Sequence, residues 1–401
     1  MTSRIAANDG AVGRRWGVET SVATAAMAAS MWSLYAVSTL APFLVADLGL
    51  SRAGVGGLVT ATFAVAAIAS LVAGQAVDVV GARRGLLTLA FAVMIALLSA
   101  SVAGSYGWLV AAIAIAGVGQ ALANPATNVL LAAGVPASRR AVAVGVKQSG
   151  VQVAGFVAGL ALPLLAGTVG WRSGLRWSAV LPAALLVAVW WLVPRDGRSA
   201  STAGSWWRWS RPSRWLARLM AYSLLLGTGL SAVSTYLPLY AVQALGMGEW
   251  AAGVALAAFG ASGLVARVLW ARWADRLSEP TTALVWLSAV AVGCVALVWL
   301  AAPVWSGLVW IGAVGVGGSA GAANAVSMLA VVRRGGATGH RSGLVSLGFF
   351  SGFVVGPSAF GLAADHIGYG ASWSMVGSVF GASALMAVGA RATAAHPVKV
   401  R

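Results

Sequence analysis

The chain alternates between long apolar runs and short polar breaks along nearly its whole length. Runs of about 20 residues match the length that an α-helix needs to cross the hydrocarbon core of a bilayer. Runs this long are unlike the ten-residue alternating strands of a membrane barrel, so the pattern predicts transmembrane helices. Twelve are predicted, over residues 20–46, 53–75, 85–104, 108–133, 142–167, 175–194, 218–244, 250–271, 281–301, 305–332, 343–364 and 371–390.

The composition supports this all-α integral membrane fold. Hydrophobic residues make up 60% of the 401 residues, charged residues make up 9%, and the mean hydropathy is +0.87. That leaves too little polar surface to cover a soluble globule of this size. The single cysteine, Cys294, lies in an apolar run, so neither an intrachain disulfide nor a metal cluster is expected. No cofactor is predicted.

The net charge of +17 is explained by topology. With twelve crossings the loops alternate between two sides, and 21 of the 26 basic residues fall on one of them. The other side receives Arg52, Arg172 and Arg176. The positive-inside rule then predicts a multi-pass protein of the plasma (cytoplasmic) membrane, with both termini in the cytosol. Nucleic acid is not an expected partner.

The two halves of the sequence form an internal repeat in the same direction. Residues 71–81 (LVAGQAVDVVG) align without a gap on residues 268–278 (VLWARWADRLS), which pairs Asp78 with Asp275 at an offset of 197. Residues 155–159 pair with 352–356 at the same offset. The repeat predicts an N-terminal six-helix half over 1–194, a linker over 195–217 and a C-terminal half over 218–401.

The predicted linker and the start of the next run combine six arginines with four tryptophans. Indole rings favour the headgroup layer and arginines favour anionic lipid, so this segment could lie along the inner membrane surface. A disordered tether between the halves is the equal alternative.

The turn after the second run carries a motif, Gly74-x-x-x-Asp78-x-x-Gly81-x-Arg83-Arg84, with a degenerate copy at Asp275-Arg276. Together with two parallel six-helix halves and a basic central loop, this motif resembles the signature of the major facilitator superfamily of transporters. The resemblance covers the whole chain. It implies that the motif latches the cytosolic side, with Asp78 facing the positive end of a helix from the other half. A solvated turn charge is the alternative.

Two features of drug:proton antiporters in that family are absent. Residues 111–116, ahead of Gly117-Val118-Gly119, hold no charge where such exporters carry an arginine. The Gly-Pro pair expected in the fifth run is missing, and a similar Gly356-Pro357 pair appears in the eleventh. The runs Asn124-Pro125-Ala126-Thr127-Asn128 and 145–150 (GVKQSG) are loosely similar to small-solute carriers of the cyanate type.

The resemblance implies a substrate site near the bilayer midplane, where buried polar residues are the candidates. Lys147 lies about 10 Å in from Arg140 along the predicted helix. Gln148 and Gln152 are one turn apart beside it, and the fourth run offers Asn124 and Asn128 at the same spacing. Lys147 could bind an anionic solute or a coupling proton, or its stem could extend to the headgroups.

Further candidates are aromatic and hydroxyl residues of the first, seventh and tenth runs. About half of the hydroxyls are expected to bond their own helix backbone instead. Arg267, near the inner end of the eighth run, is expected to be a gate or headgroup contact. No Asp or Glu falls in the middle of a predicted run, so a carboxylate relay is not expected. These further candidates are Trp32, Tyr35, Ser231, Thr235, Tyr236 and Asn324.

The sequence therefore predicts a secondary active or facilitative transporter of a small polar or anionic organic solute, working by alternating access. Efflux of apolar drugs or metabolites is one alternative, and a non-transporting membrane receptor or scaffold is another. The three histidines fall in loops or the tail with no acid at depth, which argues against an enzyme. The expected partners are the lipid bilayer and a small molecule, with the coupling ion open, and a monomer is expected.

Overall fold

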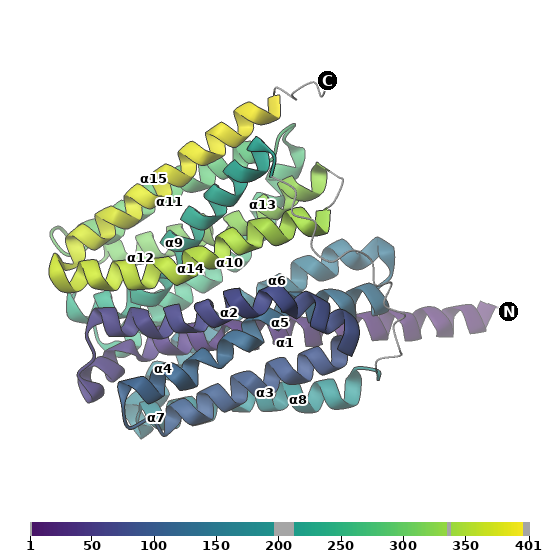
Figure 1. The fold of residues 1–401 in the computed structure, drawn as a ribbon, viewed down its shortest axis with the longest axis horizontal. Coiled ribbons are helices and arrows are strands. Elements are labelled where there is room, and N and C mark those ends of the chain that lie inside the picture. The colour runs from purple at the N-terminus through teal and green to yellow at the C-terminus, as the bar shows by residue number, and fades with distance from the viewer. Residues whose placement is uncertain (1, 196–211, 335–337, 396–401) are drawn as a thin grey trace. The chain divides into compact units, whose positions relative to one another are not determined.

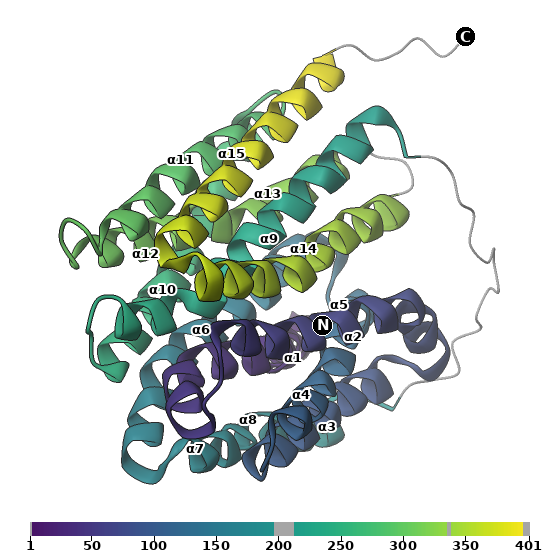
Figure 2. The same ribbon diagram turned by 60° about the vertical axis from the view of Figure 1, so that its left-hand side comes forward.

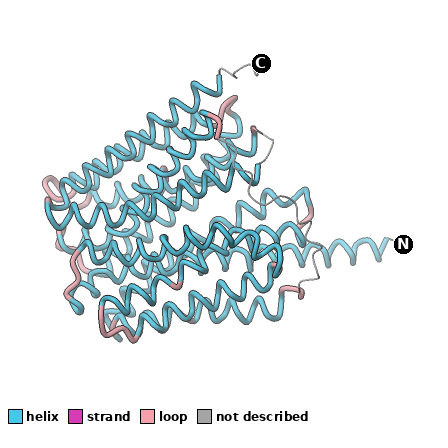
Figure 3. The backbone as a smooth tube through the Cα atoms, in the orientation of Figure 1, coloured by secondary structure: helices cyan, strands magenta, loops and turns pink. Residues whose placement is uncertain are grey.

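The structure is a computed structural model that describes residues 2–195, 212–334 and 338–395. Throughout these ranges every regular element is a helix, and short loops or turns join consecutive helices (Figure 3). Residues 196–211, the greater part of the predicted linker, lie outside the described ranges. The choice between a surface segment and a tether therefore stays open.

The first half of the chain forms the helices α1 (Thr2–Leu48), α2 (Arg52–Val80), α3 (Ala82–Ser101), α4 (Tyr106–Ala114), α5 (Ala116–Gly134), α6 (Arg140–Val169), α7 (Trp171–Ser178) and α8 (Val180–Leu192), with a short 3₁₀ turn η1 (Ala137–Arg139). The second half forms α9 (Arg214–Gln243), α10 (Glu249–Arg276), α11 (Thr281–Leu300), α12 (Leu308–Gly318), α13 (Ala320–Arg333), α14 (Thr338–His366) and α15 (Gly368–Ala395).

Twelve helical spans in the described ranges are long and apolar enough to cross a membrane, which confirms the predicted number. Three of them consist of two consecutive helices, because the fourth span joins α4 to α5, the sixth joins α7 to α8 and the tenth joins α12 to α13. The break in the tenth span falls at Ser319, whose φ of −112° and ψ of −81° are not helical. No proline marks this break in the sequence.

Large apolar side chains are exposed along the middle of several helices. Ile68 on α2 is 71% exposed, Val187 on α8 is 60% exposed and Leu385 on α15 is 67% exposed. Contiguous exposed apolar surface of this kind is not stable in water. These faces are therefore the ones that contact lipid.

The helices divide into two compact units. The first unit holds residues 1–33, 64–154 and 172–206, and the second holds residues 34–63, 155–171 and 207–401. The boundary passes through α1, α2 and α6, so the second unit includes one end of each of these helices from the first half. This division by contacts differs from the division by sequence repeat, which stays a prediction for the domain boundaries.

In the first unit α3 packs against both α5 and α8 (Figures 1 and 2). A glycine allows the close approach of α3 and α5. A Cβ atom on Gly119 would lie 2.8 Å from Val93 Cγ2 and 3.1 Å from the Leu89 carbonyl oxygen. Because lipid offers no hydrophobic reward for bringing helices together, small residues of this kind supply tight packing instead.

In the second unit α9 packs against α14 and α15, and α15 also packs along α11 (Figure 2). Glycine again sets the spacing. A Cβ atom on Gly352 of α14 would lie 2.5 Å from the backbone nitrogen of Thr228 on α9. Gly352 therefore allows the backbones of α14 and α9 to approach closely.

Contacts inside the second unit follow the sequence repeat. Ser38 donates hydrogen bonds to the carbonyl oxygens of Ser234 and Thr235, which are 196 and 197 residues further along the chain, so it contacts its own repeat equivalent. A Cβ atom on Gly56 would overlap Pro357, and one on Gly253 would overlap Gly159. Gly56 and Gly253 are 197 residues apart, and residue 159 has its repeat equivalent next to Pro357. Such paired contacts are expected for two repeats related by a twofold axis.

Candidate functional site

Lys147 is the centre of a polar cluster inside the first unit. It lies on α6, is fully buried, and directs its ammonium group at α5. Its Nζ atom donates hydrogen bonds to Asn128 Oδ1 at 2.6 Å, Thr127 Oγ1 at 2.8 Å and Asn124 Oδ1 at 3.4 Å. The structure therefore brings together the predicted lysine and both predicted asparagines.

All three acceptors of Lys147 are neutral oxygen atoms. An ammonium group has three donors, and the cluster satisfies all of them, so the lysine is held in place by α5. Among the described residues none of its acceptors is a carboxylate. A buried cation is normally paired with an anion, because leaving its charge uncompensated is costly. The cluster supplies the hydrogen bonds of a cation site without the compensating charge.

The lysine also fixes how the two asparagines are oriented. Since an ammonium cannot accept a hydrogen bond, each carboxamide must turn its oxygen toward Lys147 and its amino group away. Asn124 Oδ1 accepts a second bond, from Gln148 Nε2 at 3.1 Å. Asn128 is exposed and Asn124 is half-buried. The accessible side of the cluster therefore offers amide N–H donors.

Two other predicted residues of the first unit are buried but are not joined to this cluster by a hydrogen bond. Gln152 is 3% exposed, and its Oε1 has no hydrogen-bond partner among the described residues. Trp32 on α1 is 7% exposed, and its indole Nε1 lacks a partner in the same sense. Unsatisfied buried polar atoms are rare in proteins, so both residues stay candidates for contact with a solute.

The remaining predicted residues belong to the second unit, and all except the half-buried Asn324 are buried. Ser231 donates to Thr228 O, and Tyr236 donates to the carbonyl oxygens of Arg52 and Pro357. The Ser231 hydroxyl thus bonds its own helix, as expected for part of the set, whereas the Tyr236 hydroxyl joins α9 to α2 and α14. By contrast, hydrogen-bond partners are lacking within the described ranges for Thr235 Oγ1 and Asn324 Oδ1. Tyr35 is 3% exposed.

Two further charged residues are partly or fully buried. Arg267 on α10 is half-buried and donates to the Gly321 carbonyl oxygen at 3.2 Å, and its role as a gate or headgroup contact stays a prediction. Glu19 on α1 is 4% exposed and lies against Gly134 at the end of α5. Glu19 directly precedes the first predicted run and follows two arginines, so its sequence context is that of a solvated tail. The helix instead continues through it.

The predicted gating motif forms the turn between α2 and α3. Gly74 is half-buried within α2 and Asp78 is exposed in its last turn. Gly81 adopts φ 91° and ψ 165°, a conformation that is essentially restricted to glycine. Arg83 is buried, donates to the Trp190 carbonyl oxygen at 2.6 Å and lies 4.9 Å from that indole ring, while Arg84 is exposed.

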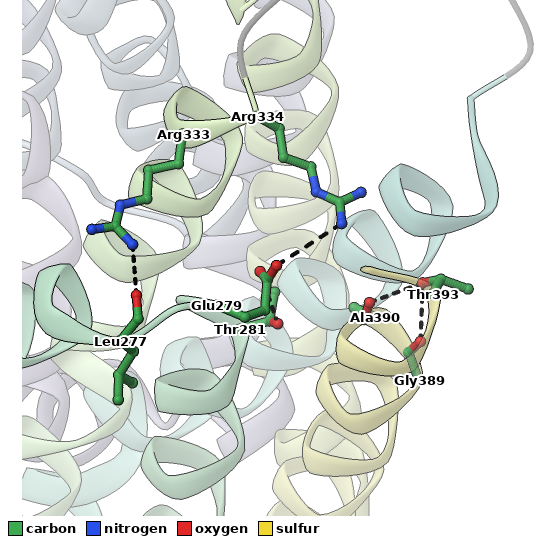
Figure 4. A network of polar contacts seen from close by, with 8 residues as sticks. All are labelled: Leu277, Glu279, Thr281, Arg333, Arg334, Gly389, Ala390 and Thr393. Atoms are coloured by element: carbon green, nitrogen blue, oxygen red, sulfur yellow. Dashed lines mark hydrogen bonds and ion pairs between the residues drawn. The ribbon is translucent and has the colours of Figure 1, made fainter. Parts of the chain in front are cut away.

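The degenerate copy follows α10. Arg276 is exposed, and the side chain of Asp275 lies outside the described part of the structure. Polar contacts surround the turn that follows α10 (Figure 4), where Arg333 donates to the Leu277 carbonyl oxygen at 2.7 Å. Arg334 lies 3.9 Å from Glu279, which also accepts a bond from Thr281. The gating roles of both turns stay predictions.

Twelve apolar spans with lipid-facing surfaces, paired contacts between two repeats and a buried polar cluster define a polytopic membrane transporter fold. The profile of the Major Facilitator Superfamily matches residues 23–339. The chain belongs to this family, which consists of transporters and not of enzymes. The predictions of the family and of the fold are confirmed.

Known proteins similar to the chain are also transporters. A protein of Pseudomonas putida named "Gallate transporter" is 30% identical over 159 residues, which cover 40% of this chain and 35% of that relative's length. The solved structure of the nucleoside transporter NupG (D323A mutant) has a TM-score of 0.75 at 12% identity, covering 93% of this chain and 99% of NupG. A D-xylose-proton symporter has a TM-score of 0.77 at 14% identity, covering 93% and 97%.

Proposed function

We propose that this protein transports a small organic anion across the cytoplasmic membrane by alternating access of its two repeats. The observation that carries the proposal is the buried ammonium of Lys147, whose three acceptors are all neutral. An anionic solute bound near this ammonium compensates its charge. An anionic solute should therefore bind more tightly than a neutral solute of the same shape.

The two asparagines extend this preference to the chemical group. Lys147 holds both carboxamide oxygens, so Asn128 and Asn124 present their amino groups as hydrogen-bond donors. A carboxylate has acceptor sites only, and it pairs well with donors of this kind. The similarity to a relative named for gallate, which is an aromatic carboxylate, supports the same class of solute.

The proposed orientation places both termini in the cytosol. It rests on the asymmetry of basic residues between the two sets of loops. By the positive-inside rule, the more basic set of loops lies in the cytosol. A single cysteine introduced at Glu249 in a Cys294→Ala protein should react with an impermeant maleimide added outside intact cells. Reaction of that cysteine from the cytosolic side only would show that the orientation is opposite to the proposed one.

Binding of gallate and of its neutral methyl ester to the purified protein tests the anion site. The two molecules share the ring and hydroxyl groups and differ in the carboxylate. We expect the wild type to bind gallate more tightly, and Lys147→Met to weaken gallate binding roughly 10- to 100-fold, the range for a lost charge-assisted interaction. Binding of the ester should change much less.

Two variants make the test specific. Ser149→Ala lies two residues along the same helix, removes a hydroxyl that bonds the α6 backbone, and should bind gallate as the wild type does. Asn128→Asp should place a carboxylate against Lys147 and compete with the anion. Equal binding of gallate by the wild type, Lys147→Met and Asn128→Asp would refute the anion site. Tighter binding of the ester than of gallate by the wild type would favour an apolar substrate.

A further inference from the structure

The start of α2 is capped by an acid from the other half of the chain. Asp365, in the last turn of α14, accepts hydrogen bonds from the backbone N–H groups of Arg52 at 3.1 Å and Ala53 at 2.8 Å. The first N–H groups of a helix have no partner within the helix, and they form the positive end of its dipole. A carboxylate placed there forms charge-assisted hydrogen bonds.

The side chain of Arg52 binds the same end of α14 and its neighbours. Its Nη1 donates to the Ala364 carbonyl oxygen at 2.8 Å, and its Nε donates to Gln243 Oε1 at 3.1 Å. The guanidinium lies 4.5 Å from the centre of the Tyr369 ring, whose hydroxyl donates to the same Gln243 oxygen at 2.8 Å. One arginine of the first repeat thus contacts α9, α14 and α15.

The contact between α2 and α14 continues along both helices for about two turns. Tyr236 bridges them, donating to the carbonyl oxygens of Arg52 at 2.7 Å and Pro357 at 2.9 Å. Further along, Thr60 Oγ1 donates to the Val354 carbonyl oxygen and lies 2.8 Å from Ser358 Oγ. These bonds lie within the second unit and join a segment of the first repeat to the second repeat.

The cap is absent from the position that the repeat makes equivalent. At the offset of 197 residues, Arg52 corresponds to Glu249 and Asp365 corresponds to Thr168. The Thr168 hydroxyl donates to carbonyl oxygens of its own helix, and Glu249 is an exposed acid in the first turn of α10. The acid cap is therefore a feature of the α2–α14 pair that twofold symmetry does not require.

We infer that Asp365, Arg52 and Ala53 form an outer latch, which holds the extracellular ends of the two repeats together and stabilises the inward-facing state. This rests on the alternating access and orientation of the proposed function. When the extracellular side opens, α2 must separate from α14 and these bonds must break. The latch thereby sets the population of the outward-facing state.

Cysteine accessibility tests the latch without a substrate. Ser38→Cys is a nearly isosteric reporter, because Ser38 is fully buried and bonded to α9 of the second repeat. In a Cys294→Ala background, an impermeant maleimide should label it slowly from outside. Asp365→Ala should raise the labelling rate roughly tenfold, which corresponds to about 1.4 kcal/mol of latch stability. Asp365→Asn keeps one acceptor oxygen, so its labelling rate should lie between those of the parent and Asp365→Ala.

Glu249→Gln is the matched control, since it removes an acid at the repeat-equivalent helix start and should leave the rate unchanged. Equal rates in Asp365→Ala, Asp365→Asn and their parent would overturn the latch. Size-exclusion elution and thermal unfolding of each variant identify one that fails to fold, in which case Asp365→Asn decides. Because no solute is present, a failed gallate experiment would leave this result intact, and an unchanged labelling rate would leave the anion site intact.

Discussion

The helix α2 has an aspartate at each of its two ends, and the two are in opposite electrostatic positions. Asp365 comes from α14 and caps the N-terminal end of α2, where two N–H groups and the helix dipole favour a negative charge. Asp78 belongs to the last turn of α2, where the dipole disfavours a negative charge, and it is exposed. Asp365 is therefore stabilised where it stands, whereas Asp78 gains by meeting a positive group elsewhere.

Alternating access requires two such contacts that form in different states, one at each end of the carrier. A carrier that exposes its site to one side at a time must close one end while it opens the other, so contacts at the two ends exclude each other. The Asp365 contacts are formed in this structure. Asp78 is predicted to form its contact in the outward-facing state. If both latches form as proposed, the two residues bias one equilibrium in opposite directions.

The largest effect should come from making the contact between α2 and α14 permanent. Thr60 Oγ1 and Ser358 Oγ are 2.8 Å apart, so the pair Thr60→Cys and Ser358→Cys in a Cys294→Ala background is placed to form a disulfide. Oxidation should abolish counterflow of gallate in proteoliposomes, and reduction should restore it. Each single-cysteine protein serves as control. Full counterflow in the oxidised double variant, with the disulfide confirmed by mass, would show that this contact never opens.

The next effect is an opposed pair of rate changes. Asp365→Asn should raise external labelling of Ser38→Cys, and Asp78→Asn should lower it, because each removes a bond from one state. Each change is expected to be several-fold, in line with about 1 kcal/mol for one charge-assisted hydrogen bond. The double variant should label at a rate close to that of the parent. A double variant equal to Asp365→Asn alone would mean that Asp78 belongs to no latch.

The fold is predictable from the sequence because the bilayer imposes it. Hydrocarbon thickness sets the length of the apolar runs, and the lack of water obliges each run to be helical, so all twelve spans can be located from the order of apolar and polar residues. Lys147 and its asparagines are predictable for a related reason, since a charge within an apolar run has to be satisfied by polar neighbours. Spacing at one turn places Asn124 and Asn128 on one face.

Contacts between distant parts of the chain cannot be predicted in this way. Asp365 follows the eleventh apolar run, but no pattern in the sequence connects it to backbone groups 312 and 313 residues earlier. Glu19 follows arginines and precedes an apolar run, so its burial against Gly134 has no local signal. Capping of one helix by another depends on tertiary packing, which a single sequence does not display.

The smallest of the expected effects concerns the turn that positions Asp78. Gly81 has φ 91° and ψ 165°, which an alanine adopts at a cost of about 1–3 kcal/mol, so Gly81→Ala should lower the thermal unfolding temperature by a few degrees. Gly74→Ala is the control, because Gly74 is in α2 and a Cβ there would meet no atom within 4 Å. Alanine in a helix is favoured over glycine by about 0.5–1 kcal/mol, so this variant should unfold at the same temperature or slightly higher. If the unfolding temperature falls in Gly81→Ala and does not fall in Gly74→Ala, the conformation of Gly81 sets the turn, and the loss of a glycine as such does not. A Gly81→Ala protein as stable as the Gly74→Ala control would show that the turn tolerates another backbone conformation and that Asp78 is not held by it.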